Sequence, residues 1–340
     1  MNWTQLDWAA LDRLREGFLT GTAARGPYWQ SLSDLANYDI TYAQRIGWKW
    51  DAVLDELLAR GWAPRTKTLL DWGCGSGVAS RRVLRAFGPE NFTTLRVWDH
   101  SPLACDYTVD SATRAFPALA VERFAPGQPV GLLVLSHVLN ELPPDARAEL
   151  LAIARHAEAV LWVEPGTHAV SRDLIALREE LRAEFRVVAP CTHQAACGLL
   201  TTDNTRHWCH AHAAPPRGIQ ADSNWVKFGQ RAGIDLRSLP YSFLVLERHA
   251  TPPAEATPPP SPAVDGARLI DDPRYFKGYA RLLSCDATGV RELMLQKRDD
   301  PALFKKLDRD PGLPLYRWER DGDRIIQATP LYPQSPAPDA

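Results

Sequence analysis

The stretch TLLDWGCGSGVASR, residues 68–81, constrains the fold of this chain more than any other. An apolar run leads into Asp71, glycines follow at positions 73, 75 and 77, and an amphipathic segment begins at once. Glycine allows a sharp turn and a close approach of a ligand, and the start of a helix offers unpaired N–H groups. Asp99 follows the next apolar run, where a carboxylate can accept hydrogen bonds from ribose hydroxyls. The motif predicts a strand–loop–helix unit that binds a nucleoside, or, alternatively, the same unit with a loop that has lost its ligand.

Short apolar runs alternate with amphipathic stretches from residue 66 to about 250, which is typical of βαβ units. Residues 1–65 instead show tryptophan, leucine and alanine at helical spacing. We therefore expect an α/β protein with N-terminal helices in 1–65 and a Rossmann-like sheet domain in 66–250. The expected strands are KTLLDW, TLRVWD, VGLLVLS, AVLWVE, FRVVA and SFLVLERH, and the expected helices are GVASRRVLRAF, PLACDYTVDSATRAF, PDARAELLAIARHA and SRDLIALREELRAEF.

The C-terminal quarter of the sequence is organised differently. Residues 251–266 are too rich in proline for a helix or a strand and predict a semi-rigid linker. Residues 267–328 contain the short runs YARLLSCD, VRELMLQK and DRIIQA, separated by turn residues, and predict a small β-rich domain. Residues 329–340 predict a disordered tail.

Composition limits the class of protein. Apolar residues make up 45% of the chain and charged residues 24%, which is typical of a globular protein and excludes wholesale disorder. The net charge of -2 excludes a generally basic protein, so any contact with nucleic acid needs a local patch. No signal sequence or membrane-spanning run is evident. We expect a cytoplasmic protein, bacterial by its Ala, Arg and Pro usage, whose six cysteines stay reduced.

The D-x-G-x-G-x-G pattern resembles motif I of the S-adenosylmethionine-dependent methyltransferases more than it resembles a dinucleotide fingerprint. The resemblance implies a sheet of the class I methyltransferase kind. It also implies that Asp71 helps to hold the amino-acid end of S-adenosylmethionine, that the loop glycines border it, and that Asp99 binds its ribose. The cofactor-binding residues expected on this basis are Asp71, Gly73, Gly75, Gly77 and Asp99.

The segment SHVLNELPP follows the fourth expected strand of the sheet. Open α/β sheets bind ligands beyond the carboxyl ends of their strands, so this loop is expected to border the methyl-transfer site. His137, Asn140 and Glu141 are the candidate catalytic residues, able to contact substrate or cofactor. The alternative is a helix-capping turn before PDARAELL.

Three cysteines, Cys191, Cys197 and Cys209, are crowded into residues 187–212. Thiolates repel one another unless a cation neutralises them, so their convergence implies a metal. The fourth ligand is Cys285 or one of His193, His207, His210 and His212, and we favour Cys285 because Cys105 falls inside an expected helix. Zinc accepts either ligand type, whereas a [4Fe–4S] cluster prefers four cysteines. The alternative is a set of cysteines buried for packing alone.

Taken together, SHVLNELP, LWVEPGT, VVAPCTHQAAC, WCH and YSFLVLER resemble the methyltransferase-like small-ribosomal-subunit protein family of mitochondria and bacteria. The resemblance spans about residues 30–320, and the cysteine block is its specific part. It implies a role in translation or ribosome assembly, with the small ribosomal subunit and its 16S rRNA as partners. It also implies a [4Fe–4S] site on Cys191, Cys197, Cys209 and Cys285.

Three functions follow as hypotheses: a methyltransferase that acts on the small subunit, a non-catalytic iron–sulfur assembly factor, and a zinc-containing methyltransferase of small molecules. RNA contact would need a basic patch. Between residues 277 and 306 the sequence has seven basic and four acidic residues, a mild excess. The candidate RNA-binding residues are Trp225, Lys227, Arg231, Lys277, Arg281, Lys297, Arg298, Lys305 and Lys306.

Overall fold

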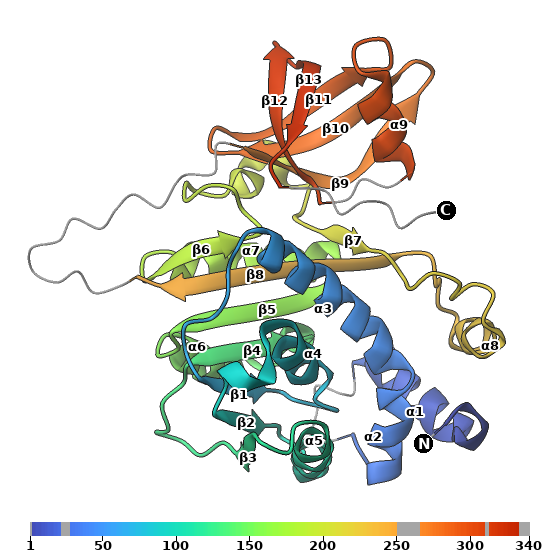
Figure 1. Ribbon diagram of the computed structural model, residues 1–340, viewed down its shortest axis with the longest axis vertical. Helices are drawn as coiled ribbons and strands as arrows, with labels where there is room; N and C mark the ends of the chain where they lie inside the picture. The colour runs from blue at the N-terminus through green and yellow to red at the C-terminus, as the bar shows by residue number, and fades with distance from the viewer. Residues whose placement is uncertain (1, 22–27, 250–265, 310–312, 333–340) are drawn as a thin grey trace, which may run out of the picture. The chain divides into compact units, whose positions relative to one another are not determined.

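The computed structural model describes residues 2–21, 28–249, 266–309 and 313–332 (Figure 1). The chain divides into two compact units. The first consists of Met1–Asp55, Ala63–Pro165 and His212–Tyr241, and the second of Glu56–Trp62, Gly166–Ala211 and Ser242–Ala340. The domain limits expected from the sequence differ from these and stay predictions.

The N-terminal region is helical, as predicted. It contains a 3-10 turn η1 (Trp3–Gln5) and the helices α1 (Trp8–Thr20), α2 (Leu32–Asp39) and α3 (Tyr42–Ala59). Asp7 and Ser31 cap α1 and α2, because each side chain accepts a hydrogen bond from a backbone N–H of the first turn. Helix α8 (Ser223–Ala232) belongs to the same unit, and Trp225 on it packs at 5.0 Å from Trp3 and 4.8 Å from Trp48, measured between ring centroids.

The first unit contains five parallel strands in the order β3-β2-β1-β4-β5. They are β1 (Thr68–Trp72), β2 (Thr94–Trp98), β3 (Ala120–Arg123), β4 (Leu132–Ser136) and β5 (Ala159–Pro165). Strands β1, β4 and β5 are almost wholly buried, as expected for parallel strands covered on both faces. The order reverses direction beside β1, which is the Rossmann-like arrangement, and the predicted α/β fold is confirmed.

Helices connect these parallel strands. They are α4 (Val78–Phe87), α5 (Pro102–Ala115) and α6 (Pro144–Ala154), with the 3-10 turns η3 (Pro89–Asn91) and η4 (Leu139–Glu141). In Figure 1, α4 lies over β1 and β4, and α5 lies beside β2 and β3. The carboxyl ends of β1, β2 and β4 are therefore followed by loops that meet at one edge of the sheet, which is where such folds bind ligands.

The second unit contains α7 (His168–Leu181), β6 (Phe185–Ala189) and β8 (Leu239–Arg248) from Ser242 onward. Strands β6 and β8 pair antiparallel, with Phe185 opposite Arg248. Between them along the chain lie the 3-10 turns η5 (Gly198–Leu200) and η6 (Thr202–Asn204) and the short strand β7 (Ala211–Ala213). The cysteine-rich segment is therefore largely irregular, as loops that hold ligands commonly are.

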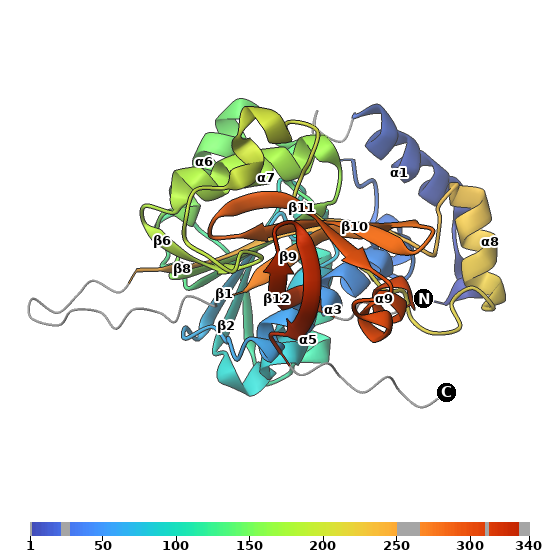
Figure 2. The same ribbon diagram turned by 90° about the horizontal axis from the view of Figure 1, so that it is seen from above.

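The C-terminal part of the second unit is a closed barrel, which confirms the expected β-rich region (Figure 2). Its core contains Leu282, Leu293 and Tyr316. Leu303 and Leu307, which lie on the helix Pro301–Arg309, belong to the same core. Inward residues alternate with outward ones along β10, as they must in a barrel wall. The elements are β9 (Ala267–Phe276), β10 (Tyr279–Asp286), β11 (Gly289–Gln296), α9 (Pro301–Arg309), β12 (Leu315–Asp321) and β13 (Arg324–Pro330).

Two expectations cannot be compared with the structure in full. All of the predicted linker except Gly266 lies outside the described residues, and so do residues 333–340 of the predicted tail. The first part of that tail, up to Pro330, is the end of β13. Among the described helices, none combines the length and the apolar character needed to span a membrane.

Candidate cofactor pocket and candidate metal centre

Three glycines bend the loop between β1 and α4, each with a positive φ: +73° at Gly73, +51° at Gly75 and +74° at Gly77. A Cβ on Gly73 would lie 2.7 Å from a methyl group of Val138, and one on Gly77 would lie 2.5 Å from the Thr108 methyl group. A Cβ on Gly75 would meet nothing within 4 Å. Gly73 and Gly77 are therefore required by packing as well as conformation, whereas Gly75 borders open space.

Asp99, directly after β2, is hydrogen-bonded to this loop. Its Oδ2 accepts from the backbone N–H of Gly75 at 2.9 Å, and its Oδ1 accepts from the N–H of Ser101 at 2.9 Å. Burial raises the pKa of Asp99, while these two hydrogen bonds oppose the shift. The carboxylate is thus fixed beside the glycine loop.

The loop and Asp99 form part of the wall of a cavity of about 580 Å³ within the first unit. That volume lies in the range of small-molecule sites. The rest of the wall is strongly aromatic, with Tyr28, Trp29 and Trp98 among the rings. His137, Asn140 and Glu141, the candidate catalytic residues, also line it. The structure therefore brings together Gly73, Gly75, Asp99, His137, Asn140 and Glu141 around one space.

Asp71 and Gly77 do not line this cavity. The Asp71 side chain is fully buried at the end of β1, and burial raises its pKa to about 7. Gly77 begins α4 and packs on Thr108. The expectation that Asp71 and Gly77 help to hold a cofactor therefore stays a prediction.

The segment after β4 is held by a glutamate that the sequence analysis did not single out. Oε1 of Glu164, on β5, accepts hydrogen bonds from the N–H groups of Val138 and Leu139 at 3.1 Å and from the Trp162 indole at 2.7 Å. Glu164 is fully buried, and burial raises its pKa to about 7. A glutamate ending the apolar run AVLWVE was the available signal, because a carboxylate is seldom buried without a purpose.

The electrostatic environment of the candidate catalytic residues is unusual. His137 has φ +58°, and burial together with the charge of Lys49 lowers its pKa well below the usual value. It is therefore neutral at pH 7. Burial, then the charges of Asp99 and Glu164, raise the pKa of Glu141 to about 7. Lys49 also lines the cavity, and burial lowers its pKa to about 8. Groups that titrate near neutral pH gather at catalytic sites, which favours a chemical role for this cavity.

The second site lies within the second unit and contains the four predicted cysteines. Cys191, Cys197, Cys209 and Cys285 all line one cavity of about 30 Å³. None of them forms a disulfide. Apolar side chains make up most of the remaining wall, and Arg178 and Arg268 are the two charged residues on it. The sequence expectation that a cysteine near the end of the chain meets the three central ones agrees with this geometry.

The buried thiols disfavour ionisation of one another. Burial, then proximity to Cys191, raises the pKa of Cys197 to about 11 and that of Cys209 to about 12. Burial and the three other thiols raise the pKa of Cys285 well above its usual value. A bound cation reverses this balance, because it stabilises thiolates that the protein alone does not. The donor set therefore suits a thiophilic metal.

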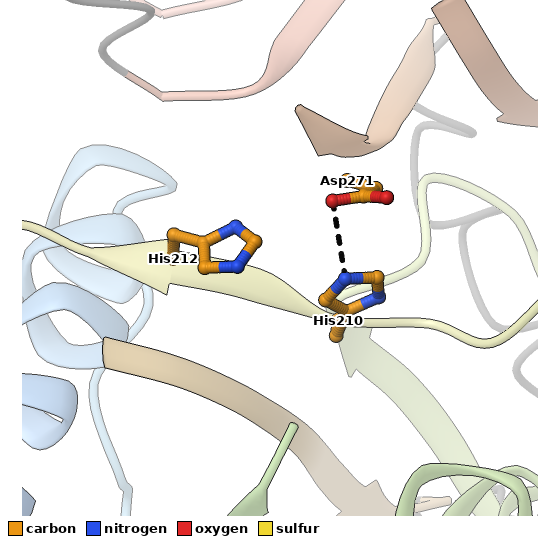
Figure 3. A group of neighbouring side chains, drawn as sticks. All are labelled: His210, His212 and Asp271. Carbon is orange, nitrogen blue, oxygen red and sulfur yellow. Dashed lines mark ion pairs between the residues drawn. The ribbon is translucent and has the colours of Figure 1, made fainter. Parts of the chain in front are cut away.

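The alternative histidine ligands behave differently from one another. Nε2 of His193 lies 3.6 Å from Sγ of Cys285. Nε2 of His210 lies 3.2 Å from a carboxylate oxygen of Asp271 (Figure 3), and its ring stacks on Trp208. Nε2 of His207 lies 3.0 Å from Nε of Arg206. His193 therefore contacts one of the clustered cysteines.

A buried ion network holds the backbone of the first cysteine. Glu56, 1% exposed, pairs with Arg60 at 2.7 Å and with Arg268. Arg60 donates to the carbonyls of Val188, Pro190 and Cys191 at 2.8, 2.9 and 3.1 Å, and Nε of Arg268 donates to Pro190 at 2.7 Å. Burial opposes ionisation of Glu56, but the two arginines outweigh it and lower its pKa. Sequence reasoning missed all three residues, because nothing local marks them.

A second arginine network orders the next cysteine. Arg178, 2% exposed on α7, donates to the carbonyl of Ala195 at 2.8 Å and pairs with Glu179. Oε1 of Glu179 accepts from the N–H of Cys197 at 3.1 Å. Ser242 donates to the carbonyl of Cys209 at 2.8 Å. Each of the three central cysteines thus has its backbone tied to a side chain from elsewhere in the unit.

The candidate RNA-binding residues fall into two groups. Trp225 is only 8% exposed and packs among other rings, so it is a core residue and not a base-stacking one. Arg231 pairs with Asp12 at 2.7 Å, and both Arg231 and Lys227 lie over the Trp8 ring. The remaining six candidates lie on the barrel or its helix, five of them exposed and Lys306 half-buried.

The fold and the two sites define an α/β protein with one cavity beside the glycine loop and another lined by four cysteines. The model of the family "Mitochondrial small ribosomal subunit Rsm22" matches residues 52–310, and the chain belongs to this family. No curated protein matches the chain.

Solved structures with a similar fold include methyltransferases. Magnesium protoporphyrin IX methyltransferase (ChlM) from Synechocystis PCC 6803 with bound SAH is 12% identical, with 71% of this chain and 95% of that one covered and a TM-score of 0.37. The plantazolicin methyltransferase BpumL in complex with SAH is 12% identical, with 71% and 100% covered and a TM-score of 0.36. Scores this low add nothing to the topology described above.

Proposed function

We propose that the chain binds S-adenosylmethionine in the cavity of its first unit and acts on, or binds, the small ribosomal subunit in translation or ribosome assembly. The single observation that carries the cofactor assignment is the hydrogen bond from Gly75 to Asp99 at the wall of a 580 Å³ cavity. Asp99 retains lone pairs for ribose hydroxyls, and Gly75 leaves space for a ligand against the loop. Family membership supports the ribosomal role.

The cofactor would supply an electrophilic methyl group, so the protein's task is largely to orient the acceptor. Glu141, with a pKa of about 7, is the group in the cavity best suited to accept a proton from that acceptor. Neutral His137 suits hydrogen bonding better than proton uptake, and exposed Asn140 offers an amide for acceptor recognition. These roles are proposals.

We further propose that Cys191, Cys197, Cys209 and Cys285 hold a [4Fe–4S] cluster. Four thiol donors around one largely apolar cavity support this proposal, because a [4Fe–4S] cluster prefers four cysteines. The cluster would supply a rigid connection between the central segment and the barrel. A zinc-containing methyltransferase of small molecules is the less favoured alternative.

Three experiments test the proposals separately. Titration calorimetry with S-adenosylmethionine tests cofactor binding, and metal analysis of anaerobically purified protein tests the cluster. Co-sedimentation with small ribosomal subunits tests the ribosomal role. Loss of one rRNA methyl mark in cells without the protein would identify an enzyme. Subunit binding that persists when cofactor binding is abolished would identify a non-catalytic assembly factor, which is the second candidate. A cytoplasmic, bacterial location stays a prediction, since the family's description is mitochondrial.

A further inference from the structure

The C-terminal barrel has a specific strand order. Numbered along the chain, its strands β9 to β13 follow one another around the barrel as 1-2-3-5-4. The third and fifth strands are parallel, the other neighbouring pairs are antiparallel, and α9 falls between the third and fourth. A five-stranded Greek-key barrel of this kind is an OB-fold, which binds oligonucleotides across strands 2 and 3 and the turns joining strands 1–2 and 4–5.

Part of that face is already covered. Leu283, Cys285 and Val290 point outward from strands 2 and 3, and they pack with Leu199, Cys197 and Cys209. A Cβ on Gly198 would lie 2.9 Å from the backbone N of Val290. The accessible remainder of the face is the opposite end of β10 and β11, next to the β9–β10 turn.

That turn presents an aromatic pair. Phe276 and Tyr279 face each other across the hairpin, with ring centroids 4.8 Å apart and planes inclined by 9°. Phe276 is 45% exposed and is the most exposed aromatic side chain in the described parts of the chain. Gly278, with φ +90°, closes the turn. A flat ring left in water at the tip of a hairpin adds nothing to the barrel core, whereas it offers a surface on which a base can stack.

Basic side chains surround the pair. Lys277 forms the tip of the turn, and the backbone N–H of Lys297 donates to the carbonyl of Gly278 at 2.9 Å, which places Lys297 beside it. The Arg281 guanidinium lies 5.9 Å from the centre of the Phe276 ring and pairs with Glu292 at 3.0 Å. Lys277 and Lys297 are both exposed and add positive charge where a phosphate backbone would follow the stacked base.

Nearby acids limit the extent of this surface. Asp299 is held by Arg324 at 2.7 Å, which neutralises it. Asp321 and Asp323 border the β12–β13 turn and disfavour phosphates there. The favourable surface is therefore small and centred on the β9–β10 turn, too limited for the dense backbone of a duplex.

We propose that this turn, with Phe276 and Tyr279 as the stacking surface and Lys277, Arg281 and Lys297 as phosphate contacts, binds single-stranded RNA. A duplex keeps its bases stacked on each other, whereas an unpaired strand can place one on the Phe276 ring. The inference rests on the proposed association with the small ribosomal subunit, which would provide such a strand.

Fluorescence anisotropy with a labelled single-stranded RNA of about 12 nucleotides tests the proposal on the full chain. Phe276→Ala combined with Tyr279→Ala is expected to weaken binding by about tenfold or more. Lys277→Gln combined with Lys297→Gln is expected to reduce the slope of log K against log salt by about 1.4. Leu19→Ala, which removes an exposed apolar side chain of α1, is the control and is expected to change neither.

Equal affinity of the aromatic double variant and the unchanged protein would overturn the proposal, as would equal affinity for the same sequence as a duplex. Co-sedimentation with small ribosomal subunits distinguishes failure of the barrel site from failure of the proposed ribosomal role. If the protein sediments with small subunits but does not bind the oligonucleotide, only the barrel site is contradicted. A chain that binds the oligonucleotide through Phe276 but not the subunits supports the barrel site and contradicts the ribosomal role.

Discussion

The guanidinium of Arg60 donates a hydrogen bond to the backbone carbonyl of Cys191 over 3.1 Å, while the same side chain pairs with buried Glu56. Arg268 pairs with the same Glu56 carboxylate and donates a hydrogen bond to the carbonyl of Pro190. One glutamate therefore orients two arginines, and both fix the segment that carries the first cysteine.

Glu56→Gln is expected to lower the free energy of unfolding by about 3–5 kcal/mol, because it leaves two buried arginines without their carboxylate. Urea unfolding at neutral pH measures the change. Glu149→Gln, an exposed carboxylate on α6, is the control and should stay within about 0.5 kcal/mol of the unchanged protein. Similar small effects of both substitutions would contradict the network's importance.

Cys285→Ser is expected to abolish the absorbance of an iron–sulfur cluster and to reduce bound iron, because three thiolates leave the proposed site open. Cys105→Ser is the matched control: this thiol lies on α5 in the first unit and should leave the iron content unchanged. Anaerobic purification followed by iron and zinc analysis is the measurement. Stoichiometric zinc, with no iron, would refute the cluster.

Gly75→Arg is expected to weaken S-adenosylmethionine binding at least about 100-fold, because the side chain enters the space beside Asp99 and φ is positive there. Gly127→Arg is the matched control. Gly127 also has a positive φ, of +86°, and open space around its Cβ, but it does not line the cavity. Calorimetric titration of both variants decides the point, and equal binding would remove the cavity as the cofactor site.

The pH dependence of stability reports on Glu164. Its pKa of about 7 lies above the value of about 4.3 in an unfolded chain, so the folded state holds a proton that the unfolded state releases. The contribution of Glu164 to the free energy of unfolding is therefore fully present below about pH 4, and it is lost as the pH rises to about 7.

Glu164→Gln should flatten that dependence and make the variant more stable than the unchanged protein at pH 8, by about 1–3 kcal/mol. Urea unfolding between pH 5 and pH 8 is the measurement. Glu149→Gln should run parallel to the unchanged protein, and a Glu164→Gln variant that also runs parallel would contradict the assignment.

The sheet was predictable from the sequence because β1, β4 and β5 are buried on both faces and read as unbroken apolar runs. Strand β3 was not, because AVER lies at an exposed edge and carries no apolar pattern. Strand β12, LYRWERD, was missed for a similar reason: most of it faces away from the barrel core.

The site was predictable only in part. The glycine loop and Asp99 follow a local pattern, and the four cysteines are conspicuous by residue type. The pairing of Glu56 with Arg268 joins residues 212 positions apart, and polar residues that meet across such a distance leave no periodic trace. The exposed ring of Phe276 could not be predicted either, because its exposure depends on how the barrel strands pair.

Strand β10 divides its side chains between two environments, with Leu282 inside the barrel and Cys285 outside it. A slip of one residue in its pairing would exchange these faces and withdraw the last thiol from its three partners. Correct barrel pairing would thus be a precondition for metal binding at the proposed site. During synthesis the first three cysteines are made well before Cys285, so a truncated polypeptide could not complete the proposed centre. Bound metal would therefore identify a chain whose final strands have been synthesised and paired.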